Sequence, residues 1–234
     1  MSRFVCIGPT AHGLPESAFR RVARHPPAAR GDLLRLVDDG ATAILLIDGL
    51  YGDRPSVSHK EILFALSRGV AVIGAASLGA LRAAECAAFG MAGIGAVFAD
   101  YQSGARTSDA DVAVLHAPEA LRWRPLSVSL VDIDATLDAA AERIGPTEAA
   151  QLASAARRLH FERRQWDAVV AAAQLPPDRI PLLERHRVYR KREDARAALD
   201  LLRAGPAAPV PLDFEPTDCF LADLRRFAPG LLRR

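Results

Sequence analysis

The chain has 234 residues, half of them hydrophobic, and a formal net charge of +2 at pH 7. This length predicts one sizeable core, or a core domain with a helical addition, and the small charge argues against a protein built mainly to hold nucleic acid. No apolar run reaches the length of a membrane span, no signal peptide is recognised and the three cysteines have no paired spacing, so we expect a cytoplasmic protein with reduced thiols and no metal site.

Hydrophobic periodicity predicts, in chain order, a strand at 3–7, helical segments at about 15–24 and 31–39, and a very apolar strand at 43–47. Asp48 follows the last of these strands. Because ligands bind at the carboxyl ends of strands in open α/β sheets, Asp48 is a candidate for substrate binding. A turn-forming aspartate explains the residue equally well.

A helix start is predicted at Ser58, because Glu61 follows it at the spacing of a capping box. This places Lys60 at about the second helical position. Only Lys60 and Lys191 are lysines among the 30 basic side chains, and lysine, unlike arginine, can act as a base. Lys191 lies within the run 190–192 and is interpreted as part of a solvated face. Lys60 is therefore the candidate base, with an ordinary exposed lysine as the alternative.

A strand, a tight turn and a helix are predicted around Ser77. The apolar run 70–73 stops at small residues, and apolar residues then recur at helical spacing. Residues 75–79 approximate the small-x-Ser-x-Gly elbow, which raises a serine hydroxyl above the end of a parallel strand and points helix amides at an oxyanion. Ser77 is a candidate nucleophile, and a helix cap is the simpler alternative.

Together these segments predict an α/β fold, with a Rossmann-like, mostly parallel sheet over residues 1–125. A right-handed crossover would bring Ser77 and Lys60 to the same sheet edge. The glycine-rich segment 90–95 is interpreted as a connector. Residues 126–234 are predicted to form a helical C-terminal region, with helices near 128–143, 147–158, 161–174, 181–202 and 217–232 and a break at Gly145-Pro146.

Several blocks of the chain resemble the TfuA family. They are residues 47–63, residues 74–85, Gly90-Met91 with Tyr101, residues 116–118 and residues 125–127. The resemblance covers about residues 3–135. It implies an accessory protein of YcaO enzymes in peptide backbone thioamidation, which belongs to ribosomal peptide modification. It also implies hydrolysis of the C-terminal thiocarboxylate of ThiS, a small sulfur carrier, by a Ser-Lys pair that carries over to Ser77 and Lys60.

The residues are compatible with this sulfur-transfer chemistry. An uncharged Lys60 amine can take the proton while the Ser77 hydroxyl attacks the thiocarboxylate carbon, and sulfide then leaves. Amides around Leu78 and Gly79 are expected to hold the oxyanion. Arg82 is expected to neutralise the thiocarboxylate or to pair with Glu85 on the helix surface. His59 and Asp48 complete the expected substrate-binding set.

Two other functions stay open at this point. A non-catalytic adaptor would bind the YcaO enzyme and the carrier while Ser77 only caps a helix. A nucleotide-binding domain ranks low, because the first strand ends in Gly8-Pro9-Thr10 and not in a Gly-x-Gly-x-x-Gly turn. The expected partners are a YcaO enzyme, a ThiS-like carrier and the precursor peptide, with no cofactor, nucleic acid or membrane.

Overall fold

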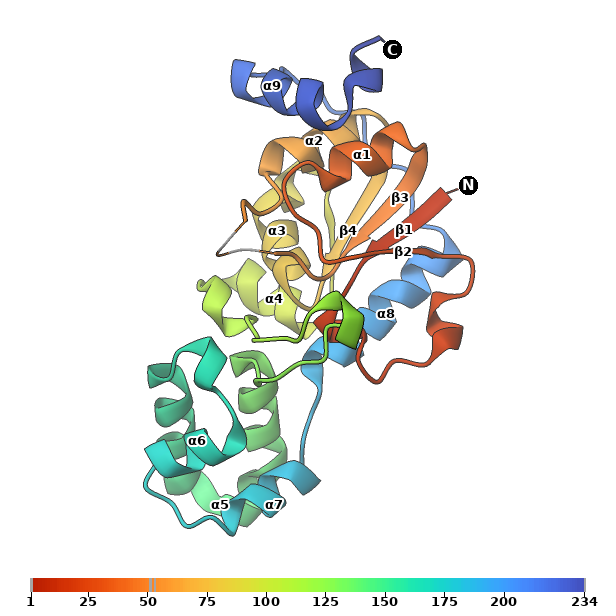
Figure 1. Cartoon of the computed structure of the whole chain (residues 1–234). Helices are drawn as coiled ribbons and strands as arrows, with labels where there is room; N and C mark the ends of the chain where they lie inside the picture. Colours follow the sequence, from red (N-terminus) through yellow and green to blue (C-terminus); the bar gives the residue numbers. More distant parts are fainter. Residues whose placement is uncertain (1, 51, 53, 234) are drawn as a thin grey trace.

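The core of the protein is a parallel β-sheet, seen in a computed structural model that describes residues 2–50, 52 and 54–233. Tyr51 and Asp53, which belong to the first block of the family resemblance, lie outside the described residues. The sheet has the strand order β2-β1-β3-β4-β5 (Figure 1). The strands are β1 (Ser2–Cys6), β2 (Ala23–His25), β3 (Ala41–Leu46), β4 (Ala71–Ala75) and β5 (Ala92–Ile94). All four pairings are parallel, which confirms the predicted α/β class.

Helices surround this sheet and continue beyond it. They are α1 (Asp32–Asp38), α2 (His59–Ser67), α3 (Leu78–Cys86), α4 (Ala96–Ser103), α5 (Leu130–Arg158), α6 (Trp166–Ala172), α7 (Arg179–Arg185), α8 (Arg190–Ala204) and α9 (Asp218–Phe227). None of the helices in the described part of the chain is both long and apolar enough to cross a membrane.

Both faces of the sheet are buried because alternate side chains of each strand enter different clusters. Ile44 and Leu46 of β3 pack in the cluster that contains the apolar residues of α1 and α2. Leu45 packs on the other face, against α8. Helix α8 suits this position because its buried residues recur at helical spacing, at positions 195, 198, 199 and 202.

The two edge strands differ from the prediction. The segment expected to be helical around 15–24 contains a short 3-10 helix, η2 (Glu16–Phe19), followed by β2. The segment 90–95, expected to be a connector, contains β5. Each edge strand has only three residues, which is too short for an alternating pattern to show. Their hydrogen bonds to β1 and β4 decide their conformation.

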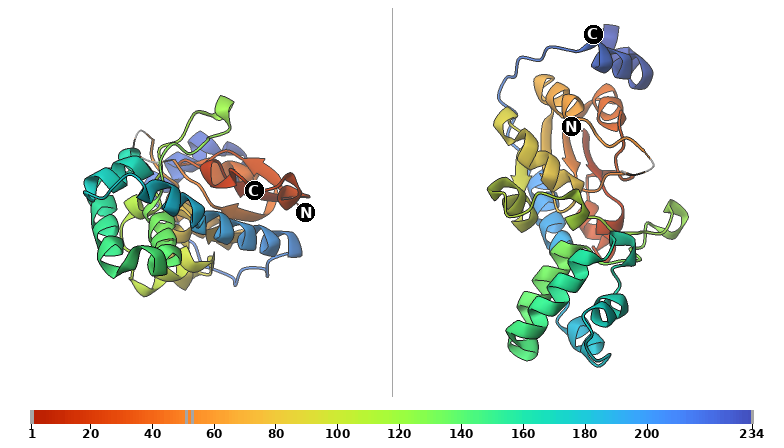
Figure 2. Two further views of the ribbon diagram at one scale, coloured as in Figure 1. Left: turned by 90° about the horizontal axis from the view of Figure 1, so that it is seen from below. Right: turned by 90° about the vertical axis from the view of Figure 1, so that its left-hand side faces the viewer.

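The predicted C-terminal region 126–234 occupies two places in the molecule. Helices α5, α6 and α7 form a cluster of their own, with α5 interrupted at Gly145 (φ 72°) as predicted. Helix α8 returns to the sheet, and α9 packs beside α1 (Figures 1 and 2). The sheet therefore needs residues beyond 126 to cover one of its faces.

Candidate functional site

Ser77 lies on the turn between β4 and α3, as predicted. The preceding residue, Ala76, has a positive φ of 65°, which is uncommon for a residue with a side chain and typical of a strained turn. The Ser77 side chain is 7% exposed and makes no capping hydrogen bond to α3. It makes no hydrogen bond to any other residue that the structure describes. The alternative in which the Ser77 side chain caps α3 is therefore wrong.

The turn is held by the close approach of α3 to β3. The Gly79 amide donates a hydrogen bond of 3.0 Å to the Ile47 carbonyl. A Cβ atom at position 79 would collide with the Leu46 carbonyl, so glycine is required there. Because its amide is already bonded, Gly79 does not serve as the predicted oxyanion donor. The Leu78 amide, at the first position of α3, has no backbone acceptor in the described part of the chain.

Ser77 lines a small cavity at the carboxyl edge of the sheet. Its volume is about 70 Å³. Three polar side chains join Ser77 in its wall, and they are Asp48, His116 and Lys191. The remaining wall is formed by Pro9, Pro27, Gly49, Leu50, Val112, Ala113, Val114 and Phe161. These four polar side chains therefore line one small space.

Lys191 is the amine of this cavity. Its side chain is 5% exposed, and its Nζ donates a hydrogen bond of 2.8 Å to the Val112 carbonyl. Its backbone N–H donates to the Asp132 carboxylate at 3.1 Å. The interpretation of Lys191 as part of a solvated face is therefore wrong. Because α8 packs on the sheet, its first turn lies against the segment 112–116.

Asp194, one turn further along α8, fixes this helix against α4. Its carboxylate accepts hydrogen bonds from the backbone N–H groups of Ala96 (3.1 Å) and Val97 (2.8 Å). These are orphan donors of the α4 N-terminus, which a carboxylate from another helix satisfies here. Burial raises the pKa of Asp194. Together, Asp194 and Lys191 define the position of the α8 start.

Asp48 is buried in the cavity wall at the end of β3, where the sequence places it. Its carboxylate accepts hydrogen bonds from the backbone N–H groups of Gly8 (2.8 Å) and Thr10 (2.9 Å) and from the Thr10 hydroxyl (2.7 Å). These bonds hold the loop after β1. Asp48 thus shapes the cavity, and its oxygens are already engaged by the protein.

The structure does not bring Lys60 to this cavity. Its Nζ donates a hydrogen bond of 3.2 Å to the Glu215 carbonyl and lies 5.2 Å from the centroid of the Phe214 ring. His59, one residue earlier, contacts Glu85 through its Nε2 at 2.8 Å. Glu85 lies about two turns beyond Ser77, which places the start of α2 about 12 Å away along α3. The start of α2 therefore lies beside α3, and neither His59 nor Lys60 lines the Ser77 cavity.

Arg82 is occupied near the start of α2. Its guanidinium contacts Glu85 at 2.6 Å, which confirms the alternative of a helix-surface pair. It also donates to the Val57 carbonyl (3.0 Å) and to the Ser56 hydroxyl (3.1 Å). Arg82 therefore holds the loop before α2 and does not line the Ser77 cavity.

The predicted capping box of α2 is confirmed, with both Ser58 and Glu61 contributing their side chains. Glu61 is fully buried and also accepts a hydrogen bond of 2.7 Å from the Gly31 N–H, just before α1. Burial raises the pKa of Glu61 to about 7, although the hydrogen bonds from Ser58 and Gly31 oppose this shift. One carboxyl group thus joins the starts of two helices.

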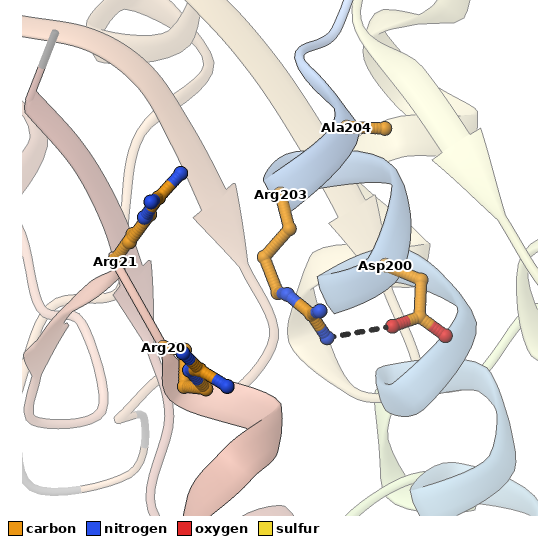
Figure 3. A pocket seen from close by; sticks show the side chains of 5 residues that line it. All are labelled: Arg20, Arg21, Asp200, Arg203 and Ala204. Carbon is orange, nitrogen blue, oxygen red and sulfur yellow. Dashed lines mark hydrogen bonds and ion pairs between the residues drawn. The ribbon is translucent and has the colours of Figure 1, made fainter.

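Another hollow, of about 530 Å³, lies between η2 and the end of α8. Figure 3 shows that Arg203 points to Asp200, with which it forms an ion pair of 3.1 Å. All five lining residues, which include Arg20, Arg21 and Ala204, are exposed. Within the described residues, no group of three histidine, cysteine or acidic side chains is arranged to hold a metal. The Ser77 cavity is therefore the candidate site.

Sequence reasoning missed two residues of this cavity, His116 and Lys191. In the sequence, His116 stands out only as part of a block of the family resemblance, with no role assigned to it, and its Nδ1 lies 2.9 Å from the Ala117 carbonyl. The scarcity of lysine was a usable signal for Lys191, since this chain otherwise places arginine where it needs a surface cation.

Comparison with known proteins assigns the chain to a family. A family model described as TfuA-like protein matches residues 48–165, which is half of the chain. No curated protein matches the chain. The matched segment includes Ser77 and His116 and ends before Lys191. Taken with the α/β core and the serine-bearing turn, this match shows that the chain belongs to the TfuA-like family.

Proposed function

We propose that this TfuA-like protein is a cytoplasmic hydrolase that releases sulfide from the C-terminal thiocarboxylate of a ThiS-type carrier and supplies it to a YcaO enzyme for peptide backbone thioamidation. One observation carries the proposal. Ser77 is a buried residue, its hydroxyl has no hydrogen-bond partner in the described residues, and it shares a small cavity with the buried amine of Lys191.

In this mechanism Ser77 is the nucleophile and Lys191 takes the role that sequence reasoning gave to Lys60. An uncharged amine has two N–H groups and one lone pair. It can donate to the Val112 carbonyl and still accept the Ser77 proton. Val112 thereby orients the amine.

The reaction proceeds in two balanced steps. The Ser77 oxygen forms a bond to the thiocarboxylate carbon and the carbon–sulfur bond breaks. Lys191 takes the hydroxyl proton and passes it to the departing sulfur, which leaves as hydrosulfide, so that the amine is uncharged again. Water then attacks the ester with Lys191 again as base, which releases the carboxylate and restores the serine. The unpaired Leu78 amide donates to the oxygen that becomes negative in each step.

The size of the cavity supports a flexible chain end as the substrate. Sites for drug-sized molecules have volumes of about 300–1,000 Å³, whereas this cavity measures about 70 Å³. It has room for a terminal group and excludes a folded domain. A carrier protein would therefore have to insert its tail.

The test is an assay of sulfide release from a thiocarboxylated ThiS-type carrier. Ser77→Ala is expected to lower the rate by about 100-fold or more, because the nucleophile is lost. Ser103→Ala, at an exposed serine of α4, is the matched control and should keep the wild-type rate. Circular dichroism should show that both variants are folded. Undiminished sulfide release by folded Ser77→Ala would remove the hydrolase function.

A non-catalytic adaptor is the second candidate, and exposed apolar residues favour it. Leu121 is 64% exposed and Leu126 is 46% exposed, on the segment that follows His116. Exposed apolar surface is typical of sites that contact other proteins. If the adaptor function is correct, Leu121→Ser will weaken YcaO binding and Ser77→Ala will leave thioamidation intact.

A further inference from the structure

A second cavity adjoins the Ser77 cavity and is strongly basic. Its volume is about 210 Å³. It shares Pro9, Val114 and Lys191 with the wall of the Ser77 cavity. Three arginines line it together with the Lys191 amine, and they are Arg124, Arg187 and Arg192, whereas Asp132 is its single carboxylate. The cavity therefore holds an excess of positive charge.

The arginines of this cavity form no ion pair with any residue that the structure describes. The guanidinium carbons of Arg187 and Arg192 lie 4.7 and 3.9 Å from the centroid of the Tyr189 ring. Both residues have a buried Nε without a hydrogen-bond partner, and neither they nor Arg124 form an ion pair within the described residues. Like charges gathered without a carboxylate partner repel one another, so an anion bound in the cavity would offset this repulsion.

Within the described residues, Asp132 forms no ion pair with these arginines. Its carboxylate accepts the backbone N–H of Lys191 at 3.1 Å. Burial raises the pKa of Asp132, while the charges of Lys191 and Arg187 act in the opposite direction. The positive end of the α8 dipole, at Tyr189 to Arg192, adds to the positive potential of the same cavity.

We propose that this cavity is an anion-binding site that takes the terminal carboxylate of an extended peptide chain. Planar guanidinium groups bind carboxylates through paired hydrogen bonds. The cavity shares His12 and Arg124 with a third cavity of about 600 Å³, whose wall includes the apolar Leu14 and Trp123. That adjoining space suits the residues that precede a chain terminus, which a free inorganic anion does not have.

The choice of a chain end as ligand rests on the proposed function, whereas anion binding itself does not require hydrolysis. The three cavities share lining residues, so a chain end held in the basic cavity would lie beside the cavity that Ser77 lines. Lys191 lines both the basic cavity and the Ser77 cavity.

The experiment measures binding of three probes to the full chain by calorimetry. The probes are an acetylated tetra-alanine peptide with a free terminal carboxylate, the same peptide with a terminal amide, and inorganic phosphate. The free acid is expected to bind at least tenfold more tightly than the amide, and added salt should weaken it. Equal binding of acid and amide would overturn the carboxylate site, and tighter binding of phosphate than of the acid would overturn the chain-end ligand.

Variants locate the site. Arg187→Gln and Arg192→Gln, measured singly and together, should each weaken binding of the acid peptide, by tenfold or more in the double variant. Arg196→Gln is the matched control, since Arg196 is exposed on α8 and outside this cavity. Unchanged affinity in the double variant overturns the location. Ser77→Ala should bind the acid peptide like the wild type, so a failure of the hydrolase proposal can be told apart from a failure of this one.

Discussion

The Lys191 amine donates a hydrogen bond of 2.8 Å to the Val112 carbonyl, and this bond joins the first turn of α8 to a wall of the Ser77 cavity. Val112 itself is buried, in a cluster with Ala80 of α3. The bond therefore links the helix that covers one sheet face to the region beside the serine-bearing turn. It fixes where the amine of the site can lie.

Replacing the two lysines separately tests which one assists Ser77. Lys191→Met should lower kcat/KM for sulfide release by about 100-fold, because the proton acceptor is lost. Lys60→Met should keep kcat/KM and lower stability by about 1 kcal/mol or less, because only its contacts to Glu215 and Phe214 are lost. Steady-state kinetics and urea unfolding give the two readouts. Loss of activity in Lys60→Met alone would contradict this assignment.

Glu61 should make stability depend on pH. Its pKa is raised to about 7 in the fold, from 4.5 in the unfolded chain, so the folded state binds the proton more tightly. The stability that this provides is fully present below pH 4.5 and is lost as the pH rises through about 7. The free energy of unfolding should fall by about 3 kcal/mol over this window from this group.

Urea unfolding of the wild type and of Glu61→Gln at several pH values checks this dependence. The difference in free energy of unfolding between the wild type and Glu61→Gln should change with pH between 4.5 and 7. It should stay constant above that range. Glu142→Gln, at an exposed glutamate of α5, is the control. Its free energy of unfolding should have the same pH dependence as that of the wild type. A wild-type curve parallel to that of Glu61→Gln would show that Glu61 does not titrate in this window.

Gly79→Ala should strongly destabilise the protein. The added methyl group would collide with the Leu46 carbonyl, which is backbone and cannot rotate away. The expected cost is about 3 kcal/mol or more, because α3 must move off β3. Thermal unfolding should show this loss, while Ala88→Ser, at an exposed position after α3, should change little. A stable Gly79→Ala protein would mean that the turn is not packed as described.

Asp194→Ala should loosen the start of α4. Two N–H groups, those of Ala96 and Val97, lose their acceptor, at a cost of about 1–3 kcal/mol. Hydrogen exchange at these two amides should become faster than in the wild type. The neighbouring Glu193→Ala, which removes only an exposed ion pair with Arg190, should leave their exchange unchanged. Equal exchange in both variants would contradict the capping role.

The amino-acid sequence by itself determined the local features of this protein. The capping box of Ser58 and Glu61, the turn that carries Ser77 and the break at Gly145 depend on residues near one another in the chain, so short patterns reveal them. The buried strands β3 and β4 were equally visible as apolar runs. The TfuA-like family model matches half of the chain, over the region that holds the sequence blocks resembling this family.

Only the tertiary structure decided which groups meet Ser77. The sequence favoured Lys60 over Lys191 as the base, because Lys60 lies at a predicted helix start. Sequence patterns locate such a start, but they do not show where in the fold it lies. Lys191 reaches the cavity because the apolar face of α8 must cover the sheet, which buries the lysine in its first turn. The same packing leaves Arg187 and Arg192 beside that cavity. Such long-range contacts are set by the burial of whole helix faces, and no local pattern encodes them.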